Sequence, residues 1–70
     1  MNEKQPRYLL EFRTLGQMGW TPGSSFKRLK DAKQCIDATL TNCQRVTEGR
    51  VFDWELMAYR YYRSAYPFKP

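Results

Sequence analysis

Apolar residues recur at spacings of three and four in the middle of the chain, in a segment from Lys27 to about Asn42. This period places them along one side of an α-helix, with charged and amide side chains around the rest of it. The segment is therefore predicted to be an amphipathic helix, whose apolar side has to be covered by other elements of the same small domain. The apolar stripe consists of Leu29, Ala32, Ile36, Leu40 and Cys43.

Residues beside this segment are suited to the ends of a helix. Ser24 or Ser25 can cap the first turn by accepting a backbone N–H, and Phe26 is placed to pack against the apolar stripe. Asn42 is a suitable residue for the helix to end on.

The segment from Arg7 to Thr14 alternates between two sides, which is the period of a half-buried strand. Gly16 to Gly19 can then turn the chain, and Trp20 begins a short return strand. Pro22 and Gly23 should soon end that strand, because proline cannot donate a hydrogen bond to a β-ladder. The two strands form a predicted hairpin. In the first strand, Tyr8, Leu10 and Phe12 face one way, while Leu9, Glu11 and Arg13 face the other.

Residues from Val51 onward alternate again. Their β-branched and aromatic side chains favour a long strand, or two strands joined at Glu48 and Gly49. A helix from Asp53 onward is the competing prediction, because apolar residues also recur there at helical spacing. The strand would place Phe52, Trp54, Leu56 and Ala58 on one side, whereas the helix would group Trp54, Met57, Ala58 and Tyr61.

The order of these elements predicts an α+β fold. A small antiparallel sheet of three or four strands carries one amphipathic helix packed across it, in the order ββαβ or ββαββ. The chain has 70 residues, which is the size of one domain. We expect a flexible N-terminus over residues 1–6, a single domain over residues 7–63 and an aromatic and basic C-terminal tail over residues 64–70.

The composition excludes several kinds of chemistry. The chain has no histidine, which is the commonest general base near neutral pH and the commonest zinc ligand. Cys35 and Cys43 lie eight positions apart on the predicted helix, about 12 Å along its axis and too far for a disulfide. Two cysteines are also too few for a zinc site, and no glycine-rich phosphate loop is present. We therefore expect no metal, no cofactor and no enzymatic activity.

Two groups of polar residues have been weighed as catalytic. Asp53 and Glu55 would share one face of a strand, where a carboxylate pair serves acid–base chemistry or holds Mg²⁺. No neighbour in sequence would perturb their pKa values, so a solvated strand face is the preferred interpretation. Ser24 and Ser25 lack a base to activate them, and helix capping is their expected role.

The charge of the chain is basic, with a net charge of +5 and a pI of about 9.5. Four of the cations fall at the start of the predicted helix, where the helix dipole favours acids instead. This local disadvantage indicates an anionic partner, although an ordinary solvated face also accounts for it. The four residues are Lys27, Arg28, Lys30 and Lys33.

The end of the chain interleaves arginines with aromatic rings. Nucleic acid bases stack on aromatic and guanidinium planes, and the charges attract phosphates. The same residue types dominate protein interfaces, and rings such as Tyr62 are alternatively needed to complete a small core. The candidate partner-binding residues here are Arg60, Tyr61, Arg63, Tyr66 and Phe68.

The assembled pattern resembles small phage- or plasmid-encoded accessory proteins. It comprises Tyr8-x-Leu10-x-Phe12, a glycine turn, Trp20, Gly23-Ser24-x-Phe26, Leu29-x-x-Ala32 on a helix and a closing strand. In outline it is similar to the compact strand-and-helix inhibitors of host enzymes made by bacteriophages, including inhibitors of RNA polymerase and of defence systems. The resemblance implies a protein target in a bacterial host. The basic charge argues against DNA mimicry.

Two binding functions follow from the sequence. The leading prediction is a module that docks on nucleic acid, with RNA or single-stranded DNA favoured, or on a nucleoprotein complex. The alternative is an inhibitor that blocks a host protein by direct contact. No apolar run approaches the roughly 20 residues that cross a bilayer, and the first residues lack the apolar segment of a signal peptide. We therefore expect a cytoplasmic protein without a membrane partner, and a homodimer is compatible with the sequence.

Overall fold

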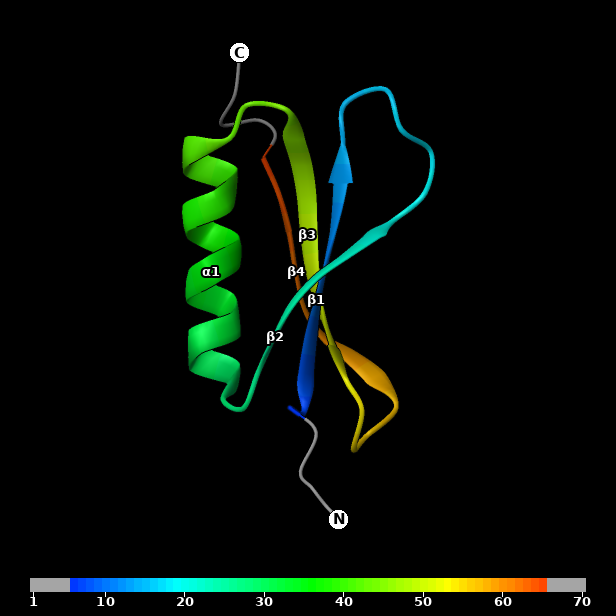
Figure 1. Cartoon of the computed structure of the whole chain (residues 1–70), viewed down its shortest axis with the longest axis vertical. Helices are drawn as coiled ribbons and strands as arrows, with labels where there is room; N and C mark the ends of the chain where they lie inside the picture. The colour runs from blue at the N-terminus through cyan, green and yellow to red at the C-terminus, as the bar shows by residue number, and fades with distance from the viewer. Residues whose placement is uncertain (1–5, 66–70) are drawn as a thin grey trace.

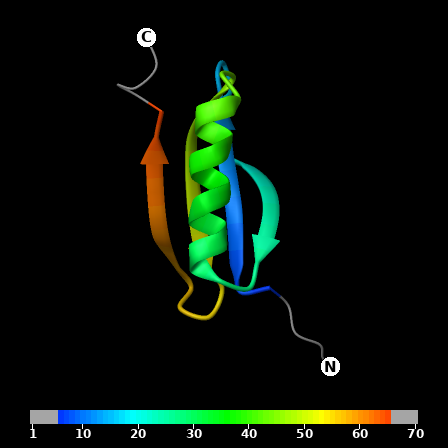
Figure 2. The ribbon, with the colours of Figure 1, turned by 90° about the vertical axis from the view of Figure 1, so that its left-hand side faces the viewer.

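One helix and four strands make up the fold in the computed structural model, which describes residues 6–65. All strand pairs are antiparallel, and the order across the sheet is β2-β1-β3-β4. The helix lies against one side of the sheet (Figures 1 and 2). The predicted α+β class, with order ββαββ, is confirmed. The elements are β1 (Tyr8–Thr14), β2 (Thr21–Phe26), α1 (Leu29–Asn42), β3 (Val46–Asp53) and β4 (Ala58–Ser64).

The core lies between α1 and the two central strands. Ile36 on the helix is fully buried, as are Leu10 on β1 and Val51 on β3. Gly49 lies opposite Ile36, and a Cβ atom at this position would come within 2.9 Å of the Ile36 Cγ2 atom. The helix packs this close to β3 because the strand has no side chain there. The buried hydrophobic residues are Tyr8, Leu10, Ala32, Ile36, Leu40, Val46, Val51 and Ala65.

β2 differs from its prediction, because it continues through Pro22 and Gly23 to Phe26. β2 is an edge strand, where a missing N–H is tolerated, and its pairing with β1 shifts register between Leu9 and Glu11. Gly23 leaves room for the ring of Phe12, whose Cε2 atom would lie 3.0 Å from a Cβ at position 23.

α1 begins at Leu29, two residues later than predicted, and ends at Asn42 as expected. Ser24 and Ser25 lie in β2, so the prediction that one of them caps the helix is wrong. Arg28 is the N-cap residue, and its side chain makes no capping hydrogen bond. No side-chain cap therefore accepts a hydrogen bond from the first backbone N–H groups of α1.

The end of α1 also differs in one detail. Ala32, Ile36 and Leu40 are buried as the stripe predicts, but Cys43 is exposed. Cys43 is the C-cap residue, and its N–H donates to the Thr39 carbonyl oxygen. No disulfide joins it to Cys35.

The connection between β3 and β4 is a turn over residues 54–57. The single long strand favoured from Val51 onward is therefore wrong, because this turn divides it. The alternative break at Glu48 and Gly49 is also wrong, because both residues lie inside β3, and the competing helix from Asp53 does not form. Met57 takes a φ of 53°, the left-handed conformation that closes the turn. Phe52 does not face the core, because the inward-facing residues of β3 include Gly49, Val51 and Asp53.

Candidate functional site

The structure brings part of the predicted site together. Lys30 and Lys33 lie on the first turns of α1, and Lys27 and Arg28 lie in the bend that precedes it. All four side chains are exposed. Arg60, Tyr61 and Arg63 lie on β4, whereas Tyr66 and Phe68 lie outside the described residues.

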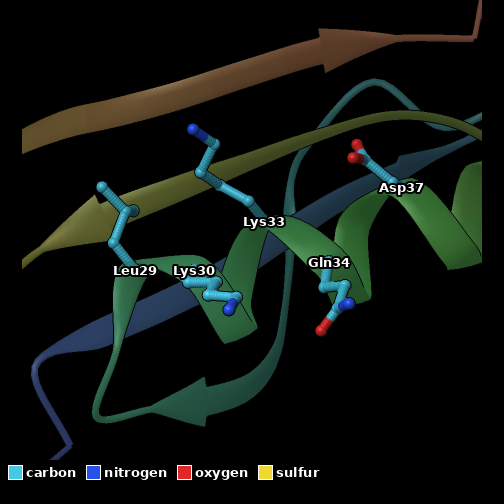
Figure 3. A pocket seen from close by; sticks show the side chains of 5 residues that line it. All are labelled: Leu29, Lys30, Lys33, Gln34 and Asp37. Carbon is cyan, nitrogen blue, oxygen red and sulfur yellow. The ribbon is translucent and has the colours of Figure 1, made fainter.

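A groove of about 420 Å³ runs along the side of α1 (Figure 3). Lys33 and Asp37 extend from the helix toward β4, while Lys30 and Gln34 point away from it. We call this surface, with Tyr61 and Arg63 of β4, the helix–β4 groove. The residues of α1 that line it are Leu29, Lys30, Lys33, Gln34 and Asp37.

Contacts beside the groove join α1 to β4. The Lys33 ammonium lies 5.1 Å from the centre of the Tyr61 ring, within the range of a cation–π interaction. The Tyr61 hydroxyl donates to an oxygen of Asp37 at 2.8 Å, and Arg63 pairs with the same oxygen at 2.8 Å. Three predicted binding residues, Lys33, Tyr61 and Arg63, therefore meet around one acid that the sequence did not single out.

Asp37 is the anionic centre of this group. Partial burial raises the pKa of Asp37, but the hydrogen bonds from Arg63 and Tyr61 outweigh that effect and hold the pKa below its ordinary value. Burial, followed by the hydrogen bond to Asp37, raises the pKa of the Tyr61 hydroxyl. The carboxylate is therefore ionised at neutral pH, and it offsets part of the positive charge of the groove.

The charge of the helix side nevertheless remains positive. Arg28 lies 3.9 Å from Asp31, a loose pair between exposed groups that contributes little. Lys27, Lys30 and Lys33 add three further exposed charges near the same end of the helix. Two acids, Asp31 and Asp37, face these cations. An anionic chain lying along α1 would therefore meet a net positive surface.

Arg60 belongs to a different site. Its Nη1 atom lies 3.1 Å from Oδ2 of Asp53, and Arg7 donates one hydrogen bond to each oxygen of the same carboxylate, to Oδ1 at 2.8 Å and to Oδ2 at 2.9 Å. The backbone N–H groups of Glu55 and Leu56 donate to the other carboxylate oxygen. Asp53 is therefore a structural centre that joins the N-terminal strand to the β3–β4 turn.

The prediction that Asp53 and Glu55 form a solvated carboxylate pair is wrong for Asp53. This side chain is fully buried, while Glu55 lies in the turn and pairs with Arg7 at 3.0 Å. The hydrogen bonds from Arg7 lower the pKa of Asp53 well below its ordinary value, against the opposing effect of burial. A permanently ionised carboxylate held by five donors serves structure and not proton transfer.

The side of the sheet opposite α1 carries a second distinctive surface. The helix covers one side of the sheet (Figure 1), and between residues 6 and 65 no helix or strand covers the other side, where Trp20 of the β1–β2 connection lies over Arg13 and Arg50. The register aligns its side chains in three rows across β1, β3 and β4. We call this surface the open face. Its rows are Leu9–Phe52–Tyr59, Glu11–Arg50–Tyr62 and Arg13–Glu48–Ser64.

Arg50 lies at the centre of the open face between two aromatic rings. Its guanidinium carbon is 4.0 Å from the centre of the Trp20 ring and 4.1 Å from that of Tyr59. Its Nε donates to Glu11 at 2.6 Å. Arg13 also lies over Trp20, at 4.9 Å, and pairs with Glu48 at 3.7 Å. The two arginines of the open face are therefore balanced by two glutamates.

Large rings of the open face are exposed. Phe52 makes edge-to-face contacts with Trp54 and Tyr59, with centroid distances of 4.9 and 5.1 Å. Trp54 is 48% exposed, Tyr59 49% and Tyr62 57%. Tyr62 therefore does not complete the core, which was one of its two predicted roles. The sequence analysis missed this surface, although the alternation of β3 locates it once Gly49 and Val51 are known to face the helix.

Between residues 6 and 65, no helix is long and apolar enough to cross a membrane. In the same part of the chain, no three acidic or cysteine side chains gather into a set that could hold a metal ion. No family model, no curated protein and no solved structure matches the chain.

Proposed function

We propose that this protein is a non-enzymatic binding module that docks on single-stranded nucleic acid, RNA or DNA, through the helix–β4 groove. The observation that carries the proposal is the meeting of the two predicted halves of the site. Lys33 of α1 lies over the Tyr61 ring of β4, beside an open groove whose helix side is basic. The outline resemblance to phage and plasmid accessory proteins supports a role of that type in the cytoplasm of a bacterial host.

Charge and shape favour a phosphate backbone as the ligand. A strand lying along α1 would place successive phosphates near Lys27, Lys30 and Lys33, which are exposed and lie on a rigid helix and its preceding bend. The groove is open, a form suited to a flexible polyanion. Arg60 is held by Asp53, so the helix side supplies most of the charge that phosphates would meet.

Salt dependence of binding tests this proposal. Fluorescence anisotropy with labelled single-stranded RNA and DNA, repeated over a series of salt concentrations, gives the slope of log K against log salt. Each neutralised phosphate contributes about −0.7 for single strands, so four cations predict a slope of about −3. A chain that binds neither RNA nor DNA at low salt would contradict the proposal.

Single substitutions locate the contact. Lys30→Gln and Lys33→Gln should each reduce the magnitude of the slope by about 0.7. Arg45→Gln is the matched control, because it removes one exposed charge from the turn that follows α1, at the opposite end of the helix from Lys30. Equal loss of affinity in all three variants would show that general charge, and not the groove, governs binding.

A pull-down from nuclease-treated lysate distinguishes nucleic acid binding from the alternative function, which is direct binding to a host protein. A nucleic-acid-binding module should lose its partners when the lysate is digested. Recovery of one stoichiometric protein after digestion would instead support the phage-type inhibitor that binds a host protein by direct contact.

A further inference from the structure

We infer that the open face binds a second copy of this chain, so that two sheets pack face to face in a homodimer. This inference goes beyond the proposed nucleic-acid function, because it uses the side of the sheet opposite the helix–β4 groove. It depends on three properties of the open face: its exposed rings, its balanced charges and its area.

The exposed rings are of the kind that interfaces bury. Tyr62 and Tyr59 project from β4, and Trp54 from the adjoining turn, each with about half of its surface exposed. Aromatic residues and arginine are enriched in the buried centres of protein interfaces, where they contribute most of the binding energy. The clustering of such rings around Phe52 makes one continuous apolar area next to the row that contains Arg50.

The charges of the open face point to a neutral partner and not to a polyanion. Both faces of the Arg50 guanidinium are covered by rings, and its Nε is bound to Glu11. It is therefore occupied, and a base or a phosphate would have to displace these contacts. Arg13 is held more loosely, 4.9 Å from the Trp20 ring centre and 3.7 Å from Glu48, and its buried Nε has no hydrogen-bond partner among the described residues.

A second copy satisfies this requirement. Two open faces brought together carry no net charge between them, and their glutamates and arginines are already paired within each chain. The opposite side of the molecule is strongly basic, so two copies of a chain with a net charge of +5 repel one another least when their helices point outward.

The area of the open face sets the expected strength. The three strands that carry the rows lie about 4.8 Å apart and are some seven residues long, so they present about 330 Å² of sheet, with rings adding relief. Stable interfaces bury about 800 Å² on each partner, so this dimer falls below that size and should be weak. We therefore expect dissociation constants between about 1 µM and about 1 mM, which fixes the concentrations that a test must cover.

Sedimentation equilibrium of the full chain tests the inference. The mass should rise from 8.4 kDa toward twice that value as the concentration rises from about 1 µM to about 1 mM. Tyr62→Glu should remain at the monomer mass, because it removes an exposed ring and adds one negative charge to each of two apposed faces. It should fold, since the Tyr62 side chain is more than half exposed.

Gln34→Glu is the matched control. It also adds one negative charge, so both variants have the same net charge, but it lies on α1 at the helix–β4 groove. It should dimerise as the unsubstituted chain does. Tyr62→Ala provides a second variant without a new charge and should weaken the dimer at least tenfold, while circular dichroism verifies its fold.

Backbone NMR spectra recorded on dilution identify the face involved. Shifts confined to Leu9, Glu11, Arg50, Phe52, Tyr59 and Tyr62 would support the inference. A chain that stays monomeric at about 1 mM would overturn it. Dimerisation that Gln34→Glu disrupts and Tyr62→Glu leaves intact would overturn it equally.

Discussion

The two sides of the sheet are built from alternate residues of the same strands, yet they bury their side chains to different degrees. Under α1, aliphatic residues such as Leu10 and Val51 are fully buried, and the ring of Tyr8 belongs to the same core. On the open face, rings such as Tyr59 and Tyr62 remain about half exposed. The buried core does not include these exposed rings, which are left for contacts outside it.

The largest test of this contrast is a substitution on the covered side. Ile36→Ala should lower the free energy of unfolding by about 2–5 kcal/mol, because it leaves a cavity against Gly49 and the central strands. Tyr62→Ala on the open face should change it by less than about 0.5 kcal/mol. Urea unfolding of both variants, at a concentration where the chain is monomeric, makes the comparison. Similar losses of unfolding free energy in the two variants would show that the covered side and the open face do not differ in this way.

Substitution of Asp53, the buried acid of β3 that binds Arg7, should have the next largest effect on stability. Hydrogen bonds from Arg7 lower the folded-state pKa of Asp53 below its unfolded value of about 3.9. The stabilisation is therefore complete above about pH 4 and is lost as the pH falls toward the folded-state pKa.

Asp53→Asn should lower the midpoint of thermal unfolding by several degrees at pH 7 and flatten the loss of stability below about pH 4. Glu55→Gln, which changes an exposed partner of the same arginine, should do neither. Calorimetry over the acid range measures both variants. An unchanged acid limb in Asp53→Asn would contradict the assigned role.

A smaller effect tests the stacking on the open face. Arg50→Lys keeps the positive charge near Glu11 but loses the planar group between two rings. We expect the free energy of unfolding to fall by about 1 kcal/mol. Near-ultraviolet circular dichroism should change as well, since Trp20 loses its neighbour. An unaltered aromatic signal would show that the rings do not depend on the guanidinium.

The smallest effect concerns the link between α1 and β4. Tyr61→Phe removes the hydroxyl that donates to Asp37, at an expected cost of about 0.5–1 kcal/mol. Since that hydrogen bond helps to lower the pKa of Asp37, the pKa should rise toward its ordinary value. Carboxyl titration by NMR measures the change. A further fall in this pKa would contradict the assignment.

Local periodicity was sufficient to predict some of these features. The stripe of α1 and the alternation of β1 were predicted correctly, because each depends on residues within one element. The path of β2 through Pro22 was not predictable, since it depends on the edge position and on a register shift in the neighbouring strand. Single-strand alternation likewise did not reveal which side of β3 faces the helix.

The site shows the same limit. Asp53 looked like a surface acid because its main partner, Arg7, stands 46 positions away in the chain. The four basic residues around the start of α1 were found from the sequence, yet the contact of Lys33 with Tyr61 depends on β4 lying at the edge of the sheet beside the helix. The environment of Asp53 and the contact between α1 and Tyr61 both depend on residues distant in the chain. Local patterns in a single sequence do not show which distant residues meet.

The central place of β1 in the sheet has a consequence for the order in which the protein folds. Its pairing with β3 joins Tyr8 to Asp53, so the first strand made has to wait for most of the chain before its second neighbour exists. At roughly 5–20 residues per second, synthesis takes seconds to supply that partner. The sheet therefore closes late, from contacts distant in sequence, and we expect slower folding than in a helical protein of the same length.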